Sequence, residues 1–346
     1  MAHKLAFIGF GGVGRGLAQI IQEREASLKK KYGTDFQMVS IADLYKGSLH
    51  HPDGLNIQAV FDSLEKDGTL HHYPDQEGLI RGWDSLTTIE RSNADTMVEI
   101  TFTDIQTGQP AIDHCKKAFA AGKNAVMTNK GPVALAYSEL QEMAAQHNVQ
   151  FKFEGTVMSG TPAIRMPLTS LAGNEISEIR GIFNGTTNYI LSRMETGMAL
   201  DDALKEAQEK GYAEADPTSD LEGWDVLYKV IILANVVMEA GLSKKDVFCE
   251  GITGLSPSDV QQAASEGKKW KLIGKIKNEK GTVSASVSPE KVPQDDPLAG
   301  ISGSLNAVTY DCDLSGPVTL MGAGAGIPET GFALLIDLIN IERNHV

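Results

Sequence analysis

The chain has 346 residues, a length that accommodates two domains with separate hydrophobic cores. Its formal net charge of -14 argues against a nucleic-acid partner and against an anionic membrane surface. The three cysteines are far apart and form no disulfide framework, and no apolar run reaches the roughly 18 residues of a membrane span. We therefore expect a cytoplasmic protein without a signal peptide, whose partners are small molecules rather than nucleic acid or membrane.

A glycine-rich turn follows the first predicted strand. Residues 4–8 form a short apolar run, a GxGxxG pattern begins at Gly9, and residues 15–21 have helical character. In this context the first glycine permits a tight turn, the second lets the backbone approach a pyrophosphate, and the third permits close helix–strand packing. The helix N-terminus then presents free N–H groups to the phosphates. We predict a dinucleotide cradle that consists of Gly9, Gly11, Gly12, Val13 and Gly14.

The second predicted strand, at 37–42, ends at Asp43. An acid in this position typically binds the ribose 2′-hydroxyl of NAD and repels the 2′-phosphate of NADP. Lys46 is near enough to bind that phosphate instead, so the sequence favours NAD without excluding NADP. The segment 47–92 is predicted to be an insertion with one helix. Its adjacent histidines lack carboxylate or cysteine neighbours at ligand spacing, so we interpret them as loop residues rather than a metal site.

Polar residues follow two further predicted strands. Thr101 and Thr103 come after the strand 96–100, and Lys130 comes after the strand 124–128. The carboxyl ends of parallel strands line the crevice in which ligands bind, so we predict these side chains at the cofactor edge. For Lys130 taken alone, the alternative is an ordinary loop lysine.

The residues after 155 are predicted to form a second domain. The small-residue turn that begins at Glu154 either joins the domains or holds a monovalent cation through oxygen atoms. The strand 176–183 runs into Asn184, Gly185 and Thr186, whose polar groups suit a small polar ligand, a hairpin turn being the alternative.

An acidic segment at 211–229 precedes an apolar helix that is predicted to extend to residue 240. Asp220 is placed to cap this helix, and Asp225 and Lys229, four residues apart, share one face of it. Alone, the segment reads as an acidic helix start with a surface ion pair. With a cofactor site and a polar junction earlier in the chain, we interpret it as a substrate site.

The C-terminal part contains a second glycine-rich loop, at 320–330, and a predicted helix at 331–341. We predict that this tail packs back onto the first domain and contributes Gly326 and Glu329 to the cofactor site. The alternative is that the tail packs elsewhere and its loop is merely flexible.

The order of these motifs resembles the homoserine dehydrogenase family over nearly the whole chain. GIFNGTTNYIL and GYAEADPTSDLEG are highly specific to that family, whereas GFGGVG is not; TNKGPVA, EGTVMSGTPAI and GAGAGIPETGFALLIDL add to the resemblance. The resemblance implies reversible NAD(P)-dependent interconversion of L-homoserine and L-aspartate 4-semialdehyde, in the pathway from aspartate to threonine and methionine. It also implies an α/β fold and a homodimer. A Rossmann-type dinucleotide-binding domain at 1–155 is completed by 316–346. A mixed-sheet domain at 156–315 serves catalysis and dimerisation, and no C-terminal regulatory domain is expected.

The resemblance also implies roles for individual residues. The family's active-site lysines fall on Lys130 and Lys229, and its substrate-binding acids and small residues fall on Glu214, Asp220, Asp225, Asn184, Gly185 and Thr186. An alkali-metal site, for sodium or potassium, falls on Glu154 and the carbonyls of Val157, Ser159 and Thr161. The family often has glycine where this chain has Met158 and Ser159.

Lysine suits proton transfer when partial burial favours its neutral form. We expect Lys229 to move the proton with Asp225 positioning it and Lys130 assisting, although the two lysines can exchange roles. Two other functions fit the sequence. One is a different amino-acid or hydroxy-acid dehydrogenase of the same architecture, and the other is a non-catalytic NAD(P) sensor, against which the proton-transfer groups argue.

Overall fold

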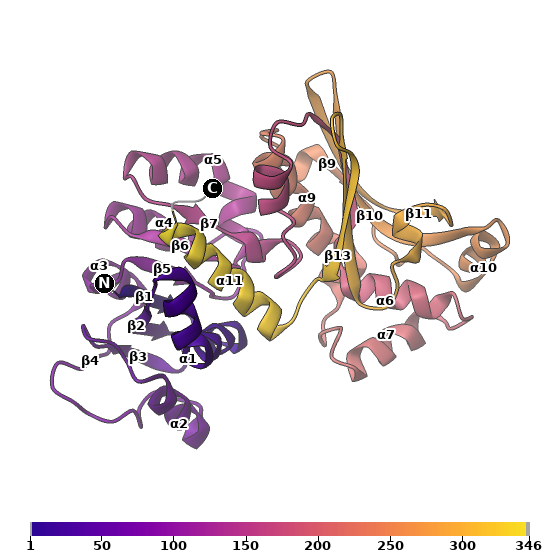
Figure 1. The fold of residues 1–346 in the computed structure, drawn as a ribbon. Helices are drawn as coiled ribbons and strands as arrows, with labels where there is room; N and C mark the ends of the chain where they lie inside the picture. Colours follow the sequence, from indigo (N-terminus) through magenta and orange to yellow (C-terminus); the bar gives the residue numbers. More distant parts are fainter. Residues whose placement is uncertain (1, 344–346) are drawn as a thin grey trace. The chain divides into compact units, whose positions relative to one another are not determined.

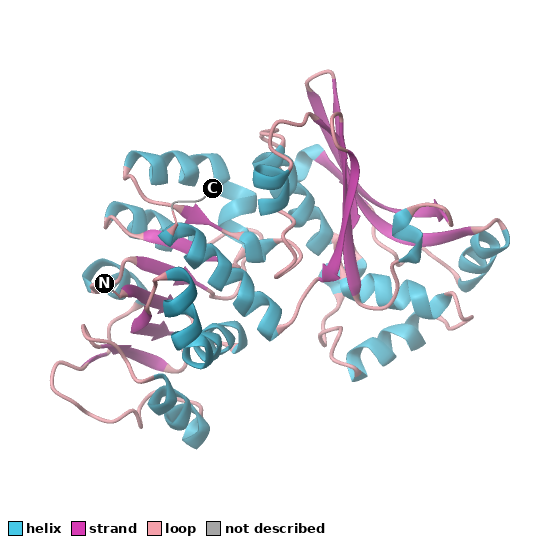
Figure 2. Ribbon diagram, viewed as in Figure 1, coloured by secondary structure: helices cyan, strands magenta, loops and turns pink. Residues whose placement is uncertain are grey.

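The computed structural model describes residues 2–343, which separate into two compact units of mixed helix and strand (Figures 1 and 2). One unit contains the chain up to Thr156 together with the segment from Gly326 onward, and the other extends from Val157 to Ala325. Within the described residues, no helix is both long and apolar enough to span a membrane. The prediction of an α/β fold with a Rossmann-type domain and a mixed-sheet second domain is confirmed.

The first unit is built on a seven-stranded sheet with the order β4-β3-β2-β1-β5-β6-β7. The parallel strands are β1 (His3–Ile8), β2 (Phe36–Asp43), β5 (Thr96–Glu99), β6 (Asn124–Met127) and β7 (Phe151–Lys152). The insertion after β2 adds the antiparallel strands β3 (Gly47–His50) and β4 (Ile80–Arg81). Strand β1 is central and almost fully buried, as expected for a parallel strand that is covered on both faces.

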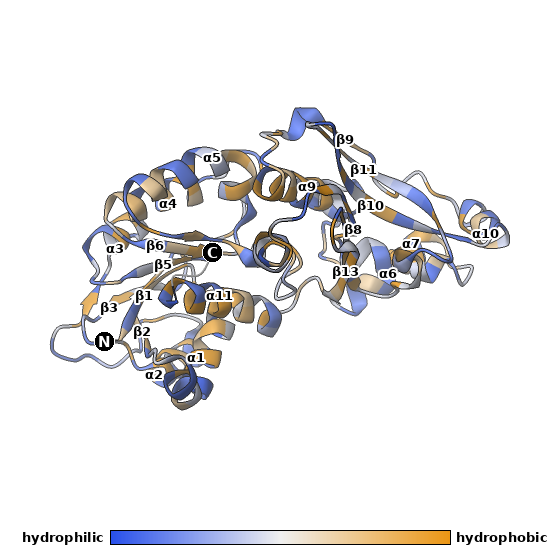
Figure 3. Ribbon diagram, turned by 45° about the horizontal axis from the view of Figure 1, so that its top comes forward, coloured by the Kyte–Doolittle hydropathy of each residue, from blue (hydrophilic) through white to orange (hydrophobic). Residues whose placement is uncertain are grey.

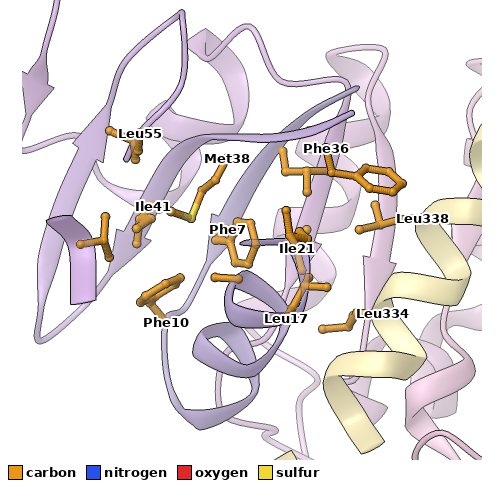
Figure 4. Close-up of a cluster of buried hydrophobic side chains, with 14 of the residues drawn as sticks. Phe7, Phe10, Leu17, Ile21, Phe36, Met38, Ile41, Leu55, Leu334 and Leu338 are labelled. Carbon is orange, nitrogen blue, oxygen red and sulfur yellow. The ribbon is translucent and has the colours of Figure 1, made fainter. Parts of the chain in front are cut away.

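The helices of this unit connect the strands. They are α1 (Gly12–Tyr32), α2 (Ile57–Asp67), α3 (Ser85–Arg91), α4 (Ala111–Ala120), α5 (Lys130–Gln146) and the C-terminal α11 (Ile327–Glu342), with a 3-10 turn at Glu154–Thr156. Helix α11 packs along α1, and side chains from β1, α1 and α11 share one core (Figure 4). Phe10, inside the glycine turn, is fully buried in that core, which fixes the turn to the sheet.

The second unit contains a six-stranded mixed sheet with the order β13-β12-β8-β10-β11-β9. Its strands are β8 (Ile176–Ile182), β9 (Val247–Cys249), β10 (Lys268–Glu279), β11 (Thr282–Pro293), β12 (Leu305–Cys312) and β13 (Gly316–Ala323). Only the β9–β11 pair among these strands is parallel. Helices α6 (Gly185–Met194), α7 (Leu200–Glu209), α8 (Thr218–Leu221), α9 (Trp224–Val237) and α10 (Pro257–Ser265) belong to this unit, and α9 is strongly hydrophobic (Figure 3). A π-helical turn at Met166–Ser170 and 3-10 turns at Lys244–Asp246 and Pro297–Gly300 complete it.

Two predicted boundaries differ from the structure. The sequence predicts that 316–346 completes the first domain, but the first part of this segment, Gly316–Ala323, is the edge strand β13 and pairs with β12 in the second sheet. Only the chain from Gly326 belongs to the first unit. The predicted loop at 320–330 is therefore shorter than expected, because its first residues continue a strand with alternating burial.

The helix predicted to follow Asp220 is interrupted. Helix α8 ends at Leu221, and α9 starts at Trp224 after Gly223, whose φ of 78° is left-handed. A residue with a side chain is disfavoured in this conformation, and a helix cannot pass through it. Asp220 therefore lies in α8 and does not cap the long helix, so its carboxyl group is available for other contacts.

Candidate active site

The glycine turn between β1 and α1 has one open side. Gly9 has a φ of 88°, and a Cβ atom there would lie 2.8 Å from the carbonyl oxygen of Ile100. A Cβ atom at Gly14 would lie 2.6 Å from the Ile100 side chain, whereas one at Gly11 would have no neighbouring atom within 4 Å. Gly9 and Gly14 are thus required by packing, and Gly11 leaves space for a ligand. Because no side chain caps α1, its first N–H groups fit a pyrophosphate at this position.

The start of α11 lies against the same turn. The side chain of Ile327 would be 3.0 Å from a Cβ atom at Gly12 and 2.8 Å from one at Gly16. Gly326 has a φ of 137°, and the carboxylate of Glu329 folds back over it so closely that a Cβ atom there would clash. The predicted cofactor residues Gly326 and Glu329 therefore lie beside the glycine turn. Val13 is partly buried against the core of this unit.

Asp43 organises the loop after β2. One carboxylate oxygen accepts the backbone N–H of Phe10 at 2.8 Å, and the other accepts those of Tyr45 and Lys46, each at 3.0 Å. Burial would raise the pKa of Asp43, but these N–H groups and the Lys46 ammonium, 3.5 Å away, outweigh it and lower the pKa below its usual range. The carboxylate therefore stays charged next to the glycine turn, where a 2′-phosphate would be repelled.

Asn129 joins the two loops that carry the remaining predicted cofactor residues. Its side-chain oxygen accepts the N–H of Gly131 at 3.0 Å and caps α5, the helix that begins with Lys130. Its amide nitrogen donates to the hydroxyl and carbonyl oxygens of Thr101 and to the carbonyl of Phe102, all at 3.3 Å. Lys130 is the first residue of this helix rather than a residue of a plain loop. Thr103 follows the exposed Phe102 on the same loop.

Lys229 is a buried lysine in α9 of the second unit, held by two acceptors. Its Nζ atom donates to the carboxylate of Asp225, one turn earlier, and to the carbonyl oxygen of Phe183 at the end of β8, each at 2.6 Å. A neutral amine has two hydrogens, which these acceptors would use, leaving its lone pair free to take a proton. In the protonated amine, the third hydrogen would point in the direction that the lone pair takes in the neutral amine. The arrangement can therefore accept or donate a proton without moving the nitrogen.

Asn184 connects the two carboxylates of this cluster. Its amide nitrogen donates to Asp220 at 2.7 Å and to Asp225 at 3.0 Å, while its oxygen accepts the N–H of Thr187 and caps α6. Both amide hydrogens are used, so Asn184 organises the cluster rather than presenting free donors. The sequence placed Asn184 among the substrate ligands but did not reveal that it bridges two acids that lie far along the chain.

Burial, and then the neighbouring carboxylate of Asp225, raise the pKa of Asp220, against the opposing effects of Asn184, Thr186 and Lys229. Gly185 is required by close approach, since a Cβ atom there would lie 2.6 Å from the carbonyl oxygen of Ser304. The hydroxyl of Thr186 donates to the carbonyl of Tyr212 at 2.6 Å.

Glu214 stands apart from these contacts. Its side chain is exposed, and its backbone carbonyl accepts a hydrogen bond from Gln208 at 3.0 Å. The structure thus brings Asn184, Asp220, Asp225 and Lys229 into direct contact and leaves the Glu214 carboxylate open to solvent.

The predicted alkali-metal residues lie on the turn where the chain passes from one unit to the other. Glu154 is buried in the first unit, while Val157, Ser159 and Thr161 belong to the second. Met158 and Ser159 have φ values of 56° and 53°, the left-handed conformation that favours glycine. Within residues 2–343, no group of three or more His, Cys, Asp or Glu side chains is arranged to hold a metal ion.

A Rossmann-type unit with a ligand-facing glycine turn, and a second unit with a buried lysine among carboxylates, define the class of dinucleotide-dependent oxidoreductases. Comparison with known proteins narrows this class. The family model for homoserine dehydrogenase matches residues 162–339. The chain belongs to the homoserine dehydrogenase family.

Individual relatives cover nearly the whole chain. An NAD(+)-dependent homoserine dehydrogenase from Pseudomonas canavaninivorans is 44% identical over 343 residues, which are 99% of this chain and 97% of the relative. A homoserine dehydrogenase from Methanocaldococcus jannaschii is 41% identical over 97% of this chain and 98% of its own. A solved structure of a hyperthermophilic archaeal homoserine dehydrogenase in complex with NADPH has a TM-score of 0.84 and 29% identity, and covers 100% of this chain and 99% of that one.

Proposed function

We propose that the chain is a homoserine dehydrogenase, which interconverts L-homoserine and L-aspartate 4-semialdehyde reversibly with NAD(P). The observation that carries this proposal is the buried Lys229, fixed by Asp225 and the Phe183 carbonyl, with Asp220 joined to Asp225 through Asn184. Oxidation of an alcohol requires a base for the hydroxyl proton, and an acidic cluster suits a substrate that carries an ammonium group. The product feeds synthesis of the amino acids derived from aspartate, as the family resemblance implies.

Each residue of the cluster in the second unit has its own role in the proposed reaction. Lys229 takes the hydroxyl proton when the alcohol is oxidised and returns it when the aldehyde is reduced. Asp225 orients Lys229, and Asn184 holds Asp225 and Asp220 in fixed positions by donating a hydrogen bond to each. Asp220 accepts a hydrogen bond from the substrate hydroxyl, the exposed Glu214 binds the substrate ammonium, and Gly185 and Thr186 border the site.

The first unit binds the dinucleotide. Gly9, Gly11, Gly12, Val13 and Gly14 hold the pyrophosphate, Thr101 and Thr103 border the nicotinamide, and Gly326 and Glu329 lie beside the glycine turn. Lys130, at the start of α5, assists catalysis from the cofactor edge. When bound, the nicotinamide supplies or accepts the hydride. The charged Asp43 supports a preference for NAD, while Lys46 is the residue that would hold the extra phosphate of NADP.

Three further features belong to the proposal and rest on the family resemblance. An alkali-metal ion binds at Glu154 and the carbonyls of Val157, Ser159 and Thr161, and the left-handed turn at Met158 and Ser159 supports this because it keeps a glycine-like backbone. The protein acts as a homodimer in the cytoplasm. Sedimentation of the purified protein would test the dimer, and a single species of monomer mass would contradict it.

The decisive experiment is formation of NADH or NADPH from L-homoserine at alkaline pH, with NAD and NADP in parallel reactions. Threonine, 3-hydroxyaspartate and malate are tested as alternative substrates in separate reactions. We expect clear turnover with homoserine only. Preferred turnover of another substrate would favour a different dehydrogenase of this architecture, and dinucleotide binding without turnover of any amino alcohol would favour a sensor.

A further inference from the structure

A chain of buried polar side chains lies beneath the cofactor edge of the first unit. Glu99, the last residue of β5, is fully buried and pairs with Nδ1 of His114 in α4 at 2.7 Å. The other ring nitrogen of His114 lies 2.8 Å from the hydroxyl of Ser85 at the start of α3. Burying a carboxylate and an imidazole is costly unless every polar atom is hydrogen-bonded, as it is here. Neither side chain is required by the roles described above.

The carboxylate of Glu99 uses its second oxygen to hold the loop after β5. This oxygen accepts the backbone N–H of Thr101 at 2.8 Å and also the Thr101 hydroxyl. Thr101 in turn accepts from the amide of Asn129, which caps the helix that starts with Lys130. The position of Lys130 at the cofactor edge is thus connected to Glu99 through Thr101 and Asn129.

We propose that Glu99 and His114 are positioning residues for the dinucleotide. His114 holds the Glu99 carboxylate, which holds the Thr101 loop, and that loop and the N-terminus of α5 are thereby kept in the geometry that receives the nicotinamide half of the cofactor. This inference rests on the proposed dinucleotide-dependent function. The contrasting interpretation is a buried hydrogen-bonded pair that stabilises the fold and has no effect on binding.

The opposite end of β5 provides a matched control. His3 is also a buried histidine, it lies 2.7 Å from the hydroxyl of Thr96 at the first position of β5, and its other ring nitrogen pairs with the carboxylate of Glu342. The chemistry is the same, because each group joins an imidazole, a carboxylate and a threonine hydroxyl by hydrogen bonds. The location differs, because ligands bind at the carboxyl ends of the strands and His3 lies near their amino ends.

The test compares His114→Asn, Glu99→Gln and His3→Asn in the full-length protein. Dissociation constants of NADH and NADPH are measured by nicotinamide fluorescence, thermal midpoints by unfolding, and KM and kcat by turnover. All three variants are expected to unfold at lower temperature. His114→Asn and Glu99→Gln are expected to weaken dinucleotide binding about five- to tenfold and to lower kcat, the size expected from losing one ordinary hydrogen bond, while His3→Asn binds like the wild type.

A second pair keeps the test valid if a histidine variant does not fold. Thr101→Ser retains the hydroxyl that Glu99 and Asn129 share, and Thr101→Val removes it. We expect Thr101→Ser to bind NADH at least threefold more tightly than Thr101→Val. Equal binding by these two variants, or equal weakening in His3→Asn and His114→Asn, would overturn the positioning role.

The binding measurement is independent of homoserine. A wild-type protein that binds NADH but does not oxidise homoserine would defeat the proposed substrate and leave the positioning result standing. Unchanged NADH binding in both the Glu99 and His114 variants, with normal homoserine turnover by the wild type, would defeat only the positioning role.

Discussion

Lys229 lies one helical turn after Asp225 in α9, and its Nζ atom is 2.6 Å from the Asp225 carboxylate. The same nitrogen is 2.6 Å from the carbonyl oxygen of Phe183, where β8 ends. A helix and a strand therefore fix one amine from two directions, and the rest of the cluster is arranged around it. A side chain held in this way loses little further freedom when it meets a substrate, which favours proton transfer.

Replacement of this amine should abolish most of the activity. Lys229→Ala is expected to lower kcat with homoserine by about 100-fold or more, the usual range for a general acid–base group, with unchanged NADH binding. Lys130→Ala should also lower kcat by about 100-fold, while NADH still binds. Lys275→Ala is the control, because it removes an ion pair to Glu290 at 2.6 Å on the sheet and should leave kcat unchanged. Near-normal turnover in both Lys229 and Lys130 variants would refute the assignment.

Asn184→Ala should impair both folding and catalysis. It removes the cap of α6, which costs about 1 kcal/mol of stability, and it releases Asp220 and Asp225 from their shared amide donor. We expect kcat to fall about tenfold, as when a bound geometry is loosened. Asn56→Ala removes an equivalent cap from α2, where the side chain accepts the N–H of Ala59 at 2.9 Å. If both variants lose the same stability and neither loses activity, Asn184 is only a cap.

The raised pKa of Asp220 predicts that removing its charge raises the stability of the protein and lowers its activity. Between the ordinary and the raised pKa, the folded state binds more protons than the unfolded state. This stabilisation is complete at acidic pH and is lost as the pH rises through the folded-state pKa. Asp220→Asn keeps an oxygen for Asn184 without the charge, so its thermal midpoint at neutral pH should rise by about 1–3 °C while kcat falls.

A neighbouring acid of opposite behaviour is the control for Asp220. Hydrogen bonds from Thr218 lower the pKa of the exposed Asp216, so stability linked to Asp216 is present at neutral pH and is lost on acidification. Asp216→Asn should therefore not raise the thermal midpoint at any pH. Measurement of both variants between pH 4 and 8 separates the two effects, and a lower midpoint for Asp220→Asn at neutral pH would be the wrong sign.

Local patterns in the sequence were sufficient for the parallel core and the glycine turn. A buried strand, spaced glycines and a helix are contiguous there, so the residues that make the structure are also neighbours in the chain. The carboxylate cluster was harder to predict from the sequence, because Asn184 contacts Asp220 and Asp225 only after folding. The sequence does not predict the break at Gly223, because a single glycine is compatible with a continuous helix. Only the left-handed φ of 78° at Gly223 shows that the helix is interrupted there. Glu99 and His114 gave no signal, since a lone acid and a lone histidine are compatible with many environments.

Gly11 should be required for the ligand and not for the fold. A Cβ atom there meets no atom within 4 Å, and the φ of -76° is open to any residue, so Gly11→Ala should unfold within about 2 °C of the wild type. The same Cβ atom would stand where the pyrophosphate approaches, so NADH binding should weaken about tenfold or more. Gly14→Ala places its Cβ atom 2.6 Å from Ile100 and should lose both stability and binding. Wild-type NADH affinity in Gly11→Ala would place the pyrophosphate elsewhere.

The pair formed by Asp43 and Lys46 should control the choice between NAD and NADP. Asp43 carries a charge kept in place by three backbone N–H groups, and Lys46 lies 3.5 Å from it. Asp43→Ala removes the repulsion of a 2′-phosphate and frees Lys46 to bind it, so the ratio of kcat/KM for NADP to that for NAD should rise about tenfold or more. Lys46→Ala should change the ratio in the opposite direction, because only NADP gains from a cation. Kinetics of both variants with both cofactors give the four numbers required. If Asp43→Ala lowers activity with NAD and NADP equally, Asp43 serves only to hold the loop, and cofactor choice is determined by other residues.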